Sequence, residues 1–268
     1  YNSMYDPATV PDFRGRASRA EEASLHPYIN YMLTDLRDQK SDGHPEGGHP
    51  MDERARRQLR ATYYGLITEV DHHLGRLFDL LRQRGVYENT LIVFTTDHGE
   101  MLWDHWLLGK EYFFDQSFHI PMIVRAPDAS ASRGRMVDAF SESIDVMPTI
   151  LDLAGGATPL QCDGASLRPW LEGGSPQGWR EEVFCELDFR DVPGGAPERE
   201  LGLRLDRCSM AIVRDKTHKY VHFAALPAVL FDLARDPQEC RNAIGDPEQA
   251  PHALRMAQKL ATWGLTKA

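Results

Sequence analysis

The sequence predicts an α/β protein in which an open sheet with covering helices is followed by a small antiparallel sheet. Three observations support this class: a long amphipathic helical pattern that leads into an apolar strand, a second apolar strand followed by another helix, and a final series of short strand-like runs separated by turn residues. The chain has 268 residues, of which 42% are hydrophobic and 26% charged, as in ordinary folded proteins. At roughly 150 residues per domain, this length suits one large domain with or without a smaller partner.

The first half of the chain begins irregularly and then becomes regular. Prolines and glycines interrupt residues 1–50, where only a short helix over Tyr28–Arg37 is predicted. From Asp52 onward, apolar residues recur at steps of three and four, which predicts a long amphipathic helix that ends at Gly85. Thr90–Thr95 is a continuous apolar and β-branched run, typical of a strand that is covered on both faces in a parallel sheet.

The second half adds one more strand of this kind and then changes character. Ile120–Arg125 predicts the second buried strand, and Ser143–Ala154 predicts a helix that ends at Gly155 in a left-handed cap. Residues 1–178 are therefore interpreted as one α/β region. Residues 179–268 are interpreted as a small antiparallel sheet closed by a helix from about Pro251, with strands predicted at Val183–Phe189, Met210–Arg214, Lys219–Phe223 and Val229–Leu233.

Charge and composition exclude several kinds of partner. The formal net charge is −10, so the surface as a whole does not attract nucleic acid or anionic lipid. The apolar stretches fall far short of the roughly 20 residues that a membrane-spanning helix needs. The four cysteines are scattered with no C-x-x-C pair, and no signal segment opens the chain, which together favour a cytoplasmic location. A chain that opens on Tyr1 without an initiator methionine also suggests that an upstream portion is absent.

The residues most suggestive of chemistry follow the first apolar strand. In open α/β sheets, ligands bind beyond the carboxyl ends of the strands, and Asp97-His98-Gly99 lies at such an end. Gly99 permits the turn that would bring the carboxylate of Asp97 and the imidazole of His98 to one ion. This donor pair suits a divalent metal such as Mn or Zn, or Ca or Mg if more oxygens are added.

An isolated Asp-His-Gly triplet has an ordinary explanation as well, in which Asp97 caps a turn and His98 is a satisfied polar residue. Lys110 favours the metal interpretation because it lies 13 residues after Asp97 and offers a compact positive charge to an anion bound at the metal. The triplet and the lysine together predict a site for a small anionic substrate.

A longer series of motifs resembles the sulfatase family of the alkaline-phosphatase superfamily, and within it the phosphonate monoester hydrolases most closely. The agreement runs in order through most of the chain, at Glu69–Leu81, Glu88–Thr90, Thr96–Glu100, Leu107–Lys110, His119–Pro121, Asp145–Thr149, Gly164–Leu167, His218–Phe223, Leu230–Leu233 and Asp236-Pro237.

This resemblance implies the C-terminal part of an alkaline-phosphatase-like sandwich with a small antiparallel-sheet subdomain. It implies a hydrolase of phosphonate monoesters or phosphodiesters, and of sulfate esters, in which Asp97 and His98 bind the metal and Lys110 contacts the substrate anion. Many sulfatases have Asn in place of His98, which favours phosphorus substrates. Related enzymes form homo-oligomers, so a homo-oligomer is expected.

The sequence departs from the family at the nucleophile. In the family a formylglycine, made from the cysteine of a C-x-P/A-x-R motif, attacks the substrate, and none of the four cysteines here lies in that motif. We therefore expect the chain to be the C-terminal portion of an enzyme whose nucleophile is encoded outside it, and to be inactive alone. The alternative is a noncatalytic binding or assembly module. Trp103, where the family usually has glycine, is expected to alter the loop above the metal.

The remaining candidates have ordinary structural interpretations that are favoured or equally good. The pair His72-His73 is expected at a helix surface, and His44 and His49 in a solvated loop. The arginines between positions 54 and 60 are expected on a solvated or subunit-contact face rather than at an anion site. For His105 and His119, a place next to the metal ligands and a purely structural role are equally open.

Overall fold

The computed structural model describes residues 1–34, 52–127 and 132–267. The chain divides into two compact units that interleave along the sequence. The first unit comprises Tyr1–Tyr5, Thr62–Asp97 and Ile120–Val183. The second unit comprises Asp6–Ala61, His98–His119 and Phe184–Ala268.

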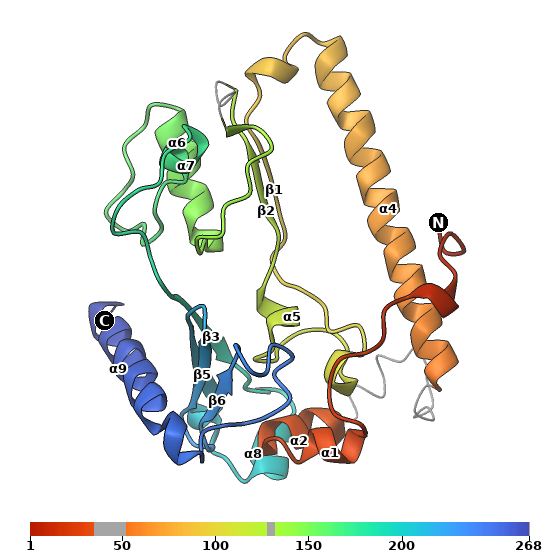
Figure 1. The fold of residues 1–268 in the computed structure, drawn as a ribbon, viewed down its shortest axis with the longest axis vertical. Coiled ribbons are helices and arrows are strands. Elements are labelled where there is room, and N and C mark those ends of the chain that lie inside the picture. Colours follow the sequence, from red (N-terminus) through yellow and green to blue (C-terminus); the bar gives the residue numbers. More distant parts are fainter. Residues whose placement is uncertain (35–51, 128–131, 268) are drawn as a thin grey trace. The chain divides into compact units, whose positions relative to one another are not determined.

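A four-stranded sheet in the order β3-β4-β5-β6 organises the second unit (Figure 1). Its strands are β3 (Val183–Asp188), β4 (Ser209–Arg214), β5 (His218–Phe223) and β6 (Val229–Asp232). The pairs β4-β5 and β5-β6 are antiparallel. The small antiparallel sheet predicted from the sequence is therefore confirmed.

Successive side chains of a strand point to opposite sides, so the sheet has two faces. Each face packs against its own group of apolar side chains and is buried. On one face, Ile212, Val221 and Phe231 join a core that also contains residues of the N-terminal helices. On the other face, Val213, Tyr220 and Leu230 pack with Met256 and Leu260 of the closing helix α9 (Ala250–Lys267). Fully burying each such side chain stabilises the fold by about 1.5–3 kcal/mol.

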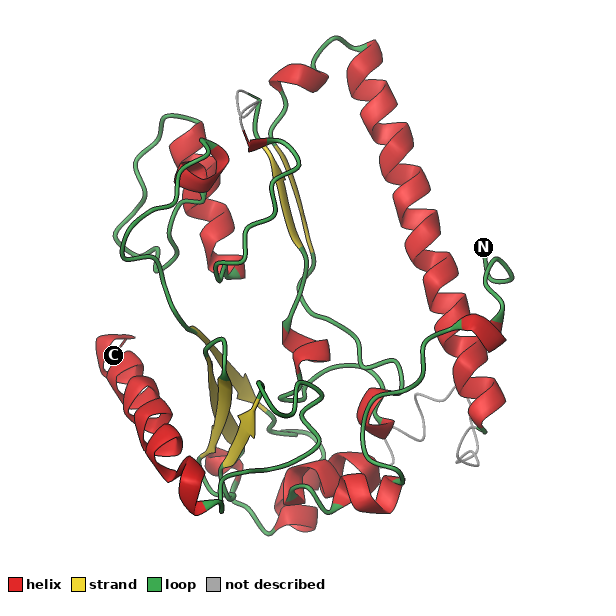
Figure 2. Cartoon of the chain, in the orientation of Figure 1, coloured by secondary structure: helices red, strands yellow, loops and turns green. Residues whose placement is uncertain are grey.

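Short helices complete the second unit, as Figure 2 shows in red. They are α1 (Arg19–Ala23), α2 (Pro27–Thr34), α5 (Asp115–Phe118) and α8 (Ala196–Leu201). Helix α2 packs against α1 and α8, and its residue Tyr28 is fully buried among Phe113, Phe189 and Phe223. The Tyr28 hydroxyl donates to the carbonyl oxygen of Glu111 at 2.6 Å, so it is not left unsatisfied in this aromatic core.

The first unit contains most of the long helix α4 (Glu53–Gln83) and a two-stranded ribbon. The ribbon pairs β1 (Ile92–Thr95) with β2 (Met122–Arg125), and Figure 2 shows it in yellow. Two further helices, α6 (Val146–Leu153) and α7 (Arg168–Leu171), follow it. Single 3-10 turns of three residues occur in both units, at Pro7–Thr9, Tyr87–Asn89, Asp104–Trp106, Ser143–Asp145, Leu205–Arg207 and Pro247–Gln249.

The prediction that β1 and β2 belong to a parallel sheet with both faces covered was wrong for the described residues. The two strands are antiparallel, with Ile92 opposite Arg125 and Thr95 opposite Met122. Their outer side chains are exposed, Phe94 at 36% and Ile123 at 61%. A continuous apolar run indicates a strand with apolar surroundings, but it does not determine whether the partner strand is parallel or antiparallel. Among the described residues, the four-stranded sheet of the second unit is the one that is covered on both faces.

Apolar side chains on the helices of the first unit are also exposed. On α4 they recur at helical spacing, at Leu66, Val70, Leu77 and Leu80, with Ile67 beside them. On α6 and just before it, Ile144, Met147 and Ile150 are exposed to a similar extent. Single exposed apolar residues are common, but a regular stripe along a helix is typical of a face that packs against protein.

Other sequence predictions are confirmed in detail. Helix α4 stops before Gly85, which has a positive φ of 69°, and α6 is followed by Gly155 at φ 77°. Helix α2 begins at Pro27, one residue before the predicted segment Tyr28–Arg37, and residues 35–37 of that segment lie outside the described residues. The compact units interleave along the sequence and do not correspond to residues 1–178 and 179–268. The domain boundary between residues 178 and 179 therefore stays a prediction. Within the described residues, no helix combines the length and apolar character needed to cross a membrane.

The β4-β5 turn gives a testable consequence for stability. Oδ1 of Asp215 accepts the backbone N–H groups of Thr217 and His218, each at 2.8 Å, and Oδ2 accepts Nη2 of Arg255 at 3.0 Å. Burial alone would raise the pKa of Asp215, but these donors outweigh it and hold the pKa below its ordinary value. The charged carboxylate therefore stabilises the folded state.

We expect Asp215→Asn to lower the free energy of unfolding by about 1–2 kcal/mol at pH 7. Because the folded pKa is lowered, the stabilisation is present above the unfolded value of about 3.9 and is lost as the pH falls through the folded pKa. The difference between wild type and variant should therefore shrink in acid, as measured by urea denaturation of the whole protein over a pH series. Lys216→Gln, in the exposed part of the same turn, is the control. A difference that is independent of pH would contradict the role of the charge.

Candidate functional site

Asp97 lies two residues beyond the end of β1, at the end of the segment Thr62–Asp97 of the first unit. Its side chain is exposed, and Thr96 Oγ1 donates to its Oδ1 at 3.3 Å. The chain therefore presents this carboxylate at the carboxyl end of a strand, as the sequence predicts. A carboxylate exposed at the end of a strand is a chemical group that binds divalent cations.

His98 begins the segment His98–His119 of the second unit and is half-buried. Its Nδ1 lies 2.6 Å from the carbonyl oxygen of Gly99. Because a carbonyl oxygen only accepts, Nδ1 donates in this contact, which leaves Nε2 as the ring nitrogen that can carry a lone pair for a metal. This is the tautomer of a metal-binding histidine, whose other ring N–H is usually donated to a carbonyl or carboxylate.

The donor chemistry of Asp97 and His98 thus fits a divalent metal, but two side chains do not complete a coordination shell. Within the described residues, no group of three or more His, Cys, Asp or Glu side chains is arranged to hold a metal ion. The convergence of Asp97 and His98 on one ion stays a prediction. A metal bound by Asp97 and His98 would need further ligands besides these two side chains.

Residues 99–110 form a loop that leads from His98 to Lys110 and closes on itself. Oε1 of Glu100 accepts the backbone N–H of Gly109 at 2.6 Å and that of Leu102 at 3.3 Å. The N–H of Met101 donates to the carbonyl oxygen of Gly109 at 3.0 Å. The two ends of the loop are therefore held together by hydrogen bonds at its base.

The backbone of this loop is strained. Four of its non-glycine residues have a positive φ, namely Leu102 (45°), Trp103 (70°), His105 (54°) and Trp106 (62°), and Glu111 follows at 83°. Bulky side chains rarely adopt this region, and each such residue costs of the order of 1 kcal/mol or more. Trp103 therefore keeps a conformation that glycine adopts freely, while its side chain is 7% exposed.

Buried polar contacts hold the middle of the loop in place. Asp104 Oδ1 accepts Nη2 of Arg60 at 2.8 Å, and Arg60 is only 5% exposed. His105 Nδ1 lies 2.9 Å from Oε1 of Glu22, and both side chains are fully buried. The ring of His105 also stacks on Phe114 with 3.7 Å between centroids. These contacts give His105 a clear structural role in supporting the loop.

Lys110 leaves the loop directly after Gly109, whose φ is 77°, and its side chain is exposed. Lys110 makes no ion pair with the residues that the structure describes. The next residues, Tyr112, Phe113 and Phe114, are buried almost completely in the core of the second unit. A solvent-facing ammonium group is thus carried by a short segment with a firmly packed continuation.

The other sequence candidates have different outcomes. His72 and His73 lie at the exposed surface of α4 with stacked rings, as expected. His119 is exposed, and no contact in the described residues decides between its two interpretations. His44 and His49 lie outside the described residues.

The prediction of a solvated arginine face was wrong for Arg60, which is buried on Asp104. Arg57 pairs with Asp12 and Glu53, and Arg56 stacks over the ring of Trp106 at 4.6 Å. Apart from Glu53, the partners of these arginines lie more than 40 positions away in the sequence. Sequence spacing alone could not identify those partners.

Sequence reasoning missed a buried ionic cluster beside the loop. Lys219 of β5 is 2% exposed; its Nζ lies 2.5 Å from Oδ1 of Asp115 and also contacts the carboxylate of Glu239. Burial would raise the pKa of Asp115, but Lys219 and Arg214 outweigh it and lower that pKa. Burial and the nearby Asp115 raise the pKa of Glu239. The only sequence signal was a charged residue, Lys219, at a core-facing strand position.

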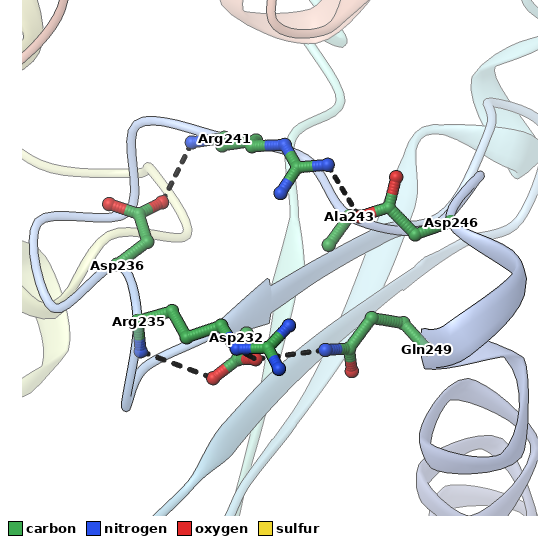
Figure 3. A pocket seen from close by; sticks show the side chains of 7 residues that line it. All are labelled: Asp232, Arg235, Asp236, Arg241, Ala243, Asp246 and Gln249. Atoms are coloured by element: carbon green, nitrogen blue, oxygen red, sulfur yellow. Dashed lines mark hydrogen bonds and ion pairs between the residues drawn. The ribbon is translucent and has the colours of Figure 1, made fainter.

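A small depression lies elsewhere in the second unit (Figure 3). Its polar side chains satisfy one another: Gln249 Nε2 donates to Asp232 at 2.8 Å, and Arg241 donates to Asp246 at 2.6 Å and, through its backbone N–H, to Asp236 at 2.8 Å. The residues around the depression lie between the end of β6 and the 3-10 turn that precedes α9. We interpret it as a structural network, since its charged groups are paired.

Comparison with known proteins identifies two matching families. The model of the sulfatase family matches residues 13–157. The model described as N-sulphoglucosamine sulphohydrolase, C-terminal, matches residues 103–264. Together these matches extend over most of the chain and include Asp97, His98 and Lys110.

Individual relatives agree with these families. The multifunctional alkaline phosphatase superfamily protein PehA of Trinickia caryophylli is 44% identical over 269 residues, covering 100% of this chain and 52% of its own length. The crystal structure of a phosphonate monoester hydrolase of Agrobacterium radiobacter has a TM-score of 0.92 and 40% identity, over 99% of this chain and 53% of its own. A phosphonate monoester hydrolase from Silicibacter pomeroyi has a TM-score of 0.89 and 37% identity, over 100% and 53%. The chain thus spans about half the length of these relatives.

The start of the loop gives a prediction that depends only on packing. A Cβ atom on Gly99 would lie 1.9 Å from the carbonyl oxygen of Gln116, so Gly99→Ala must displace the chain and weaken the bond from Gly99 N to Ser117 O. We expect a loss of about 1–3 kcal/mol in unfolding free energy. Gly75→Ala in α4, where a Cβ meets nothing within 4 Å, should be neutral or stabilising by up to about 1 kcal/mol. Equal thermal unfolding midpoints for the two variants would contradict the close approach at Gly99.

Proposed function

This chain belongs to the sulfatase family, and from that premise we propose that the whole protein is a metal-dependent hydrolase of phosphonate monoesters and phosphodiesters that also accepts sulfate esters. The likeness to phosphonate monoester hydrolases over nearly the whole chain supports phosphorus esters as the main substrates. The observation that carries the proposal is the loop of residues 99–110, which links the proposed metal ligand His98 to the proposed anion-binding Lys110.

Each proposed residue has a role that follows from its chemistry. Asp97 and His98 would hold the metal, the first through its carboxylate and the second through its imidazole. When bound, the metal supplies positive charge that stabilises the developing negative charge of the reacting ester. Lys110 binds a non-bridging oxygen of the substrate through its ammonium group, which is a point charge that suits a tetrahedral anion.

The nucleophile is proposed to come from outside these 268 residues. None of the four cysteines lies in a C-x-P/A-x-R motif, and the chain spans about half of its relatives. The exposed apolar stripe of α4 and the exposed faces of β1 and β2 also suit packing against further protein. Overall, hydrolysis breaks the bond between phosphorus and the ester oxygen, and one water molecule supplies the hydroxyl group on phosphorus and the proton on the leaving alcohol.

The substrate is proposed to be small and anionic because the charged groups offered to it are few and close in sequence. His98, in a position where many sulfatases have asparagine, supports phosphorus over sulfur chemistry. The sulfatase family match supports side activity on sulfate esters, which share the tetrahedral anionic centre. The net charge of −10 does not favour a polyanionic substrate such as nucleic acid.

Substitution of the metal ligand tests the proposal most directly. We expect Asp97→Ala, made in the full-length enzyme, to reduce turnover of an aryl phosphonate monoester at least about a thousandfold and to reduce the bound metal, because metal charge stabilisation supplies several kcal/mol. Asp79→Ala on the exposed surface of α4 is the matched control. Unchanged turnover and metal content in Asp97→Ala would reject the assignment, and a full-length protein with no turnover of any ester would favour the noncatalytic module.

The preference among esters is a separate prediction. We expect the full-length enzyme to have a higher kcat/KM for a phosphonate monoester than for the matched phosphodiester, and the lowest value for the matched sulfate ester. The measurement uses one aryl leaving group throughout, so that only the transferred group changes. A sulfate ester that is turned over most efficiently would place the enzyme among the sulfatases proper.

A further inference from the structure

We propose that Glu100 is a positioning residue that fixes the direction in which Lys110 leaves the loop. Its carboxylate closes the base of residues 99–110 and so determines where the proposed anion-binding ammonium group can reach. This inference rests on the proposed function, because it assumes that Lys110 binds the substrate anion. It concerns residues of the second unit only.

The contact of Glu100 with Gly109 is the central observation. Oε1 accepts the N–H of Gly109 at 2.6 Å, and Gly109 is the residue immediately before Lys110. The same oxygen accepts the N–H of Leu102 at 3.3 Å. Hydrogen bonds from N–H groups to an ionised carboxylate are about twice as strong as those between neutral groups. One side chain therefore joins the first residues of the loop to its last ones.

A second bond makes this closure specific in geometry. The N–H of Met101 donates to the carbonyl oxygen of Gly109 at 3.0 Å, so both polar groups of the Gly109 backbone are held from the beginning of the loop. Gly109 has a φ of 77°, which turns the chain sharply at that point. Loss of the Glu100 contact would release the turn on one side, and Lys110 is the first side chain after it.

Lys110 needs such positioning because its own side chain provides little. A lysine has a flexible four-carbon stem, and the described residues supply no ion pair that would fix this one. Its direction depends on the backbone that carries it. A displacement of about 1 Å at a substrate-binding group can reduce the rate by about a hundredfold.

Glu100 differs from the other carboxylates that contact the loop. Asp104 of the loop pairs with the buried Arg60, and Glu22 contacts the buried His105 of the loop, so removal of either carboxylate would leave a buried polar partner unsatisfied. Glu100 is only half-buried and binds backbone N–H groups. Its substitution should therefore change the loop without unfolding the protein.

The test compares three variants of the full-length enzyme on an aryl phosphonate monoester. Glu100→Ala should lower kcat/KM by about 10–100-fold, with a raised KM, while the metal content stays at the wild-type level. Glu100→Gln should recover most of the activity, because its amide oxygen can accept the same two N–H groups. Glu111→Gln, which removes an exposed negative charge on the other side of Lys110, is the control and should remain within about twofold of wild type.

A double-mutant cycle separates positioning from a general structural effect. If Glu100 acts through Lys110, then Glu100→Ala should cause almost no further loss in a Lys110→Ala background. A full additional loss in that background would overturn the proposal, as would a Glu100→Gln variant as impaired as Glu100→Ala. Full activity of Glu100→Ala would also overturn it. Full activity of Lys110→Ala would instead reject the anion-binding role itself, and with it the proposed site.

Discussion

The buried pairing of Glu22 with His105 is the contact on which the proposed site most depends. It fixes a residue with a φ of 54° in the middle of a loop whose backbone would otherwise relax, since several neighbouring residues are also in the left-handed region. Glu22 is in addition the acceptor for the N–H of Arg16 at 2.7 Å, so its second oxygen is satisfied. Strain of this kind persists only where surrounding contacts determine the structure, and it is concentrated at functional sites in many proteins.

Much of the fold follows from local sequence, whereas the support of the site does not. The period of apolar residues predicted α4, and the turn residues predicted the strands of the second unit, because these signals lie within single elements. The contact of Glu22 with His105 joins residues 83 positions apart, and no local pattern reports it. The antiparallel pairing of β1 with β2 was missed for the same reason, since partner and direction are properties of the tertiary structure.

The candidate residues themselves were accessible from the sequence because their chemistry is carried by residue type and order. A carboxylate and an imidazole after an apolar strand, followed by a lysine, form a recognisable constellation even before any distance is known. What the sequence did not provide was the means by which Lys110 is presented. Glu100 was part of a recognised motif, but its bonds to Gly109 and Leu102 become visible only when the loop is folded.

A continuous series of contacts links the sheet of the second unit to the start of the loop of residues 99–110. Lys219 on β5 binds Asp115, which begins α5, and its ammonium group also donates to the carbonyl oxygen of Phe113 at 3.1 Å. Two residues after Asp115, the carbonyl oxygen of Ser117 accepts the N–H of Gly99 at 2.9 Å. A lysine buried in a sheet is expensive unless it is paired, and here its partners hold the segment that lies against Gly99. The C-terminal sheet therefore contributes to the site by holding the residue next to His98, although it supplies none of the proposed ligands.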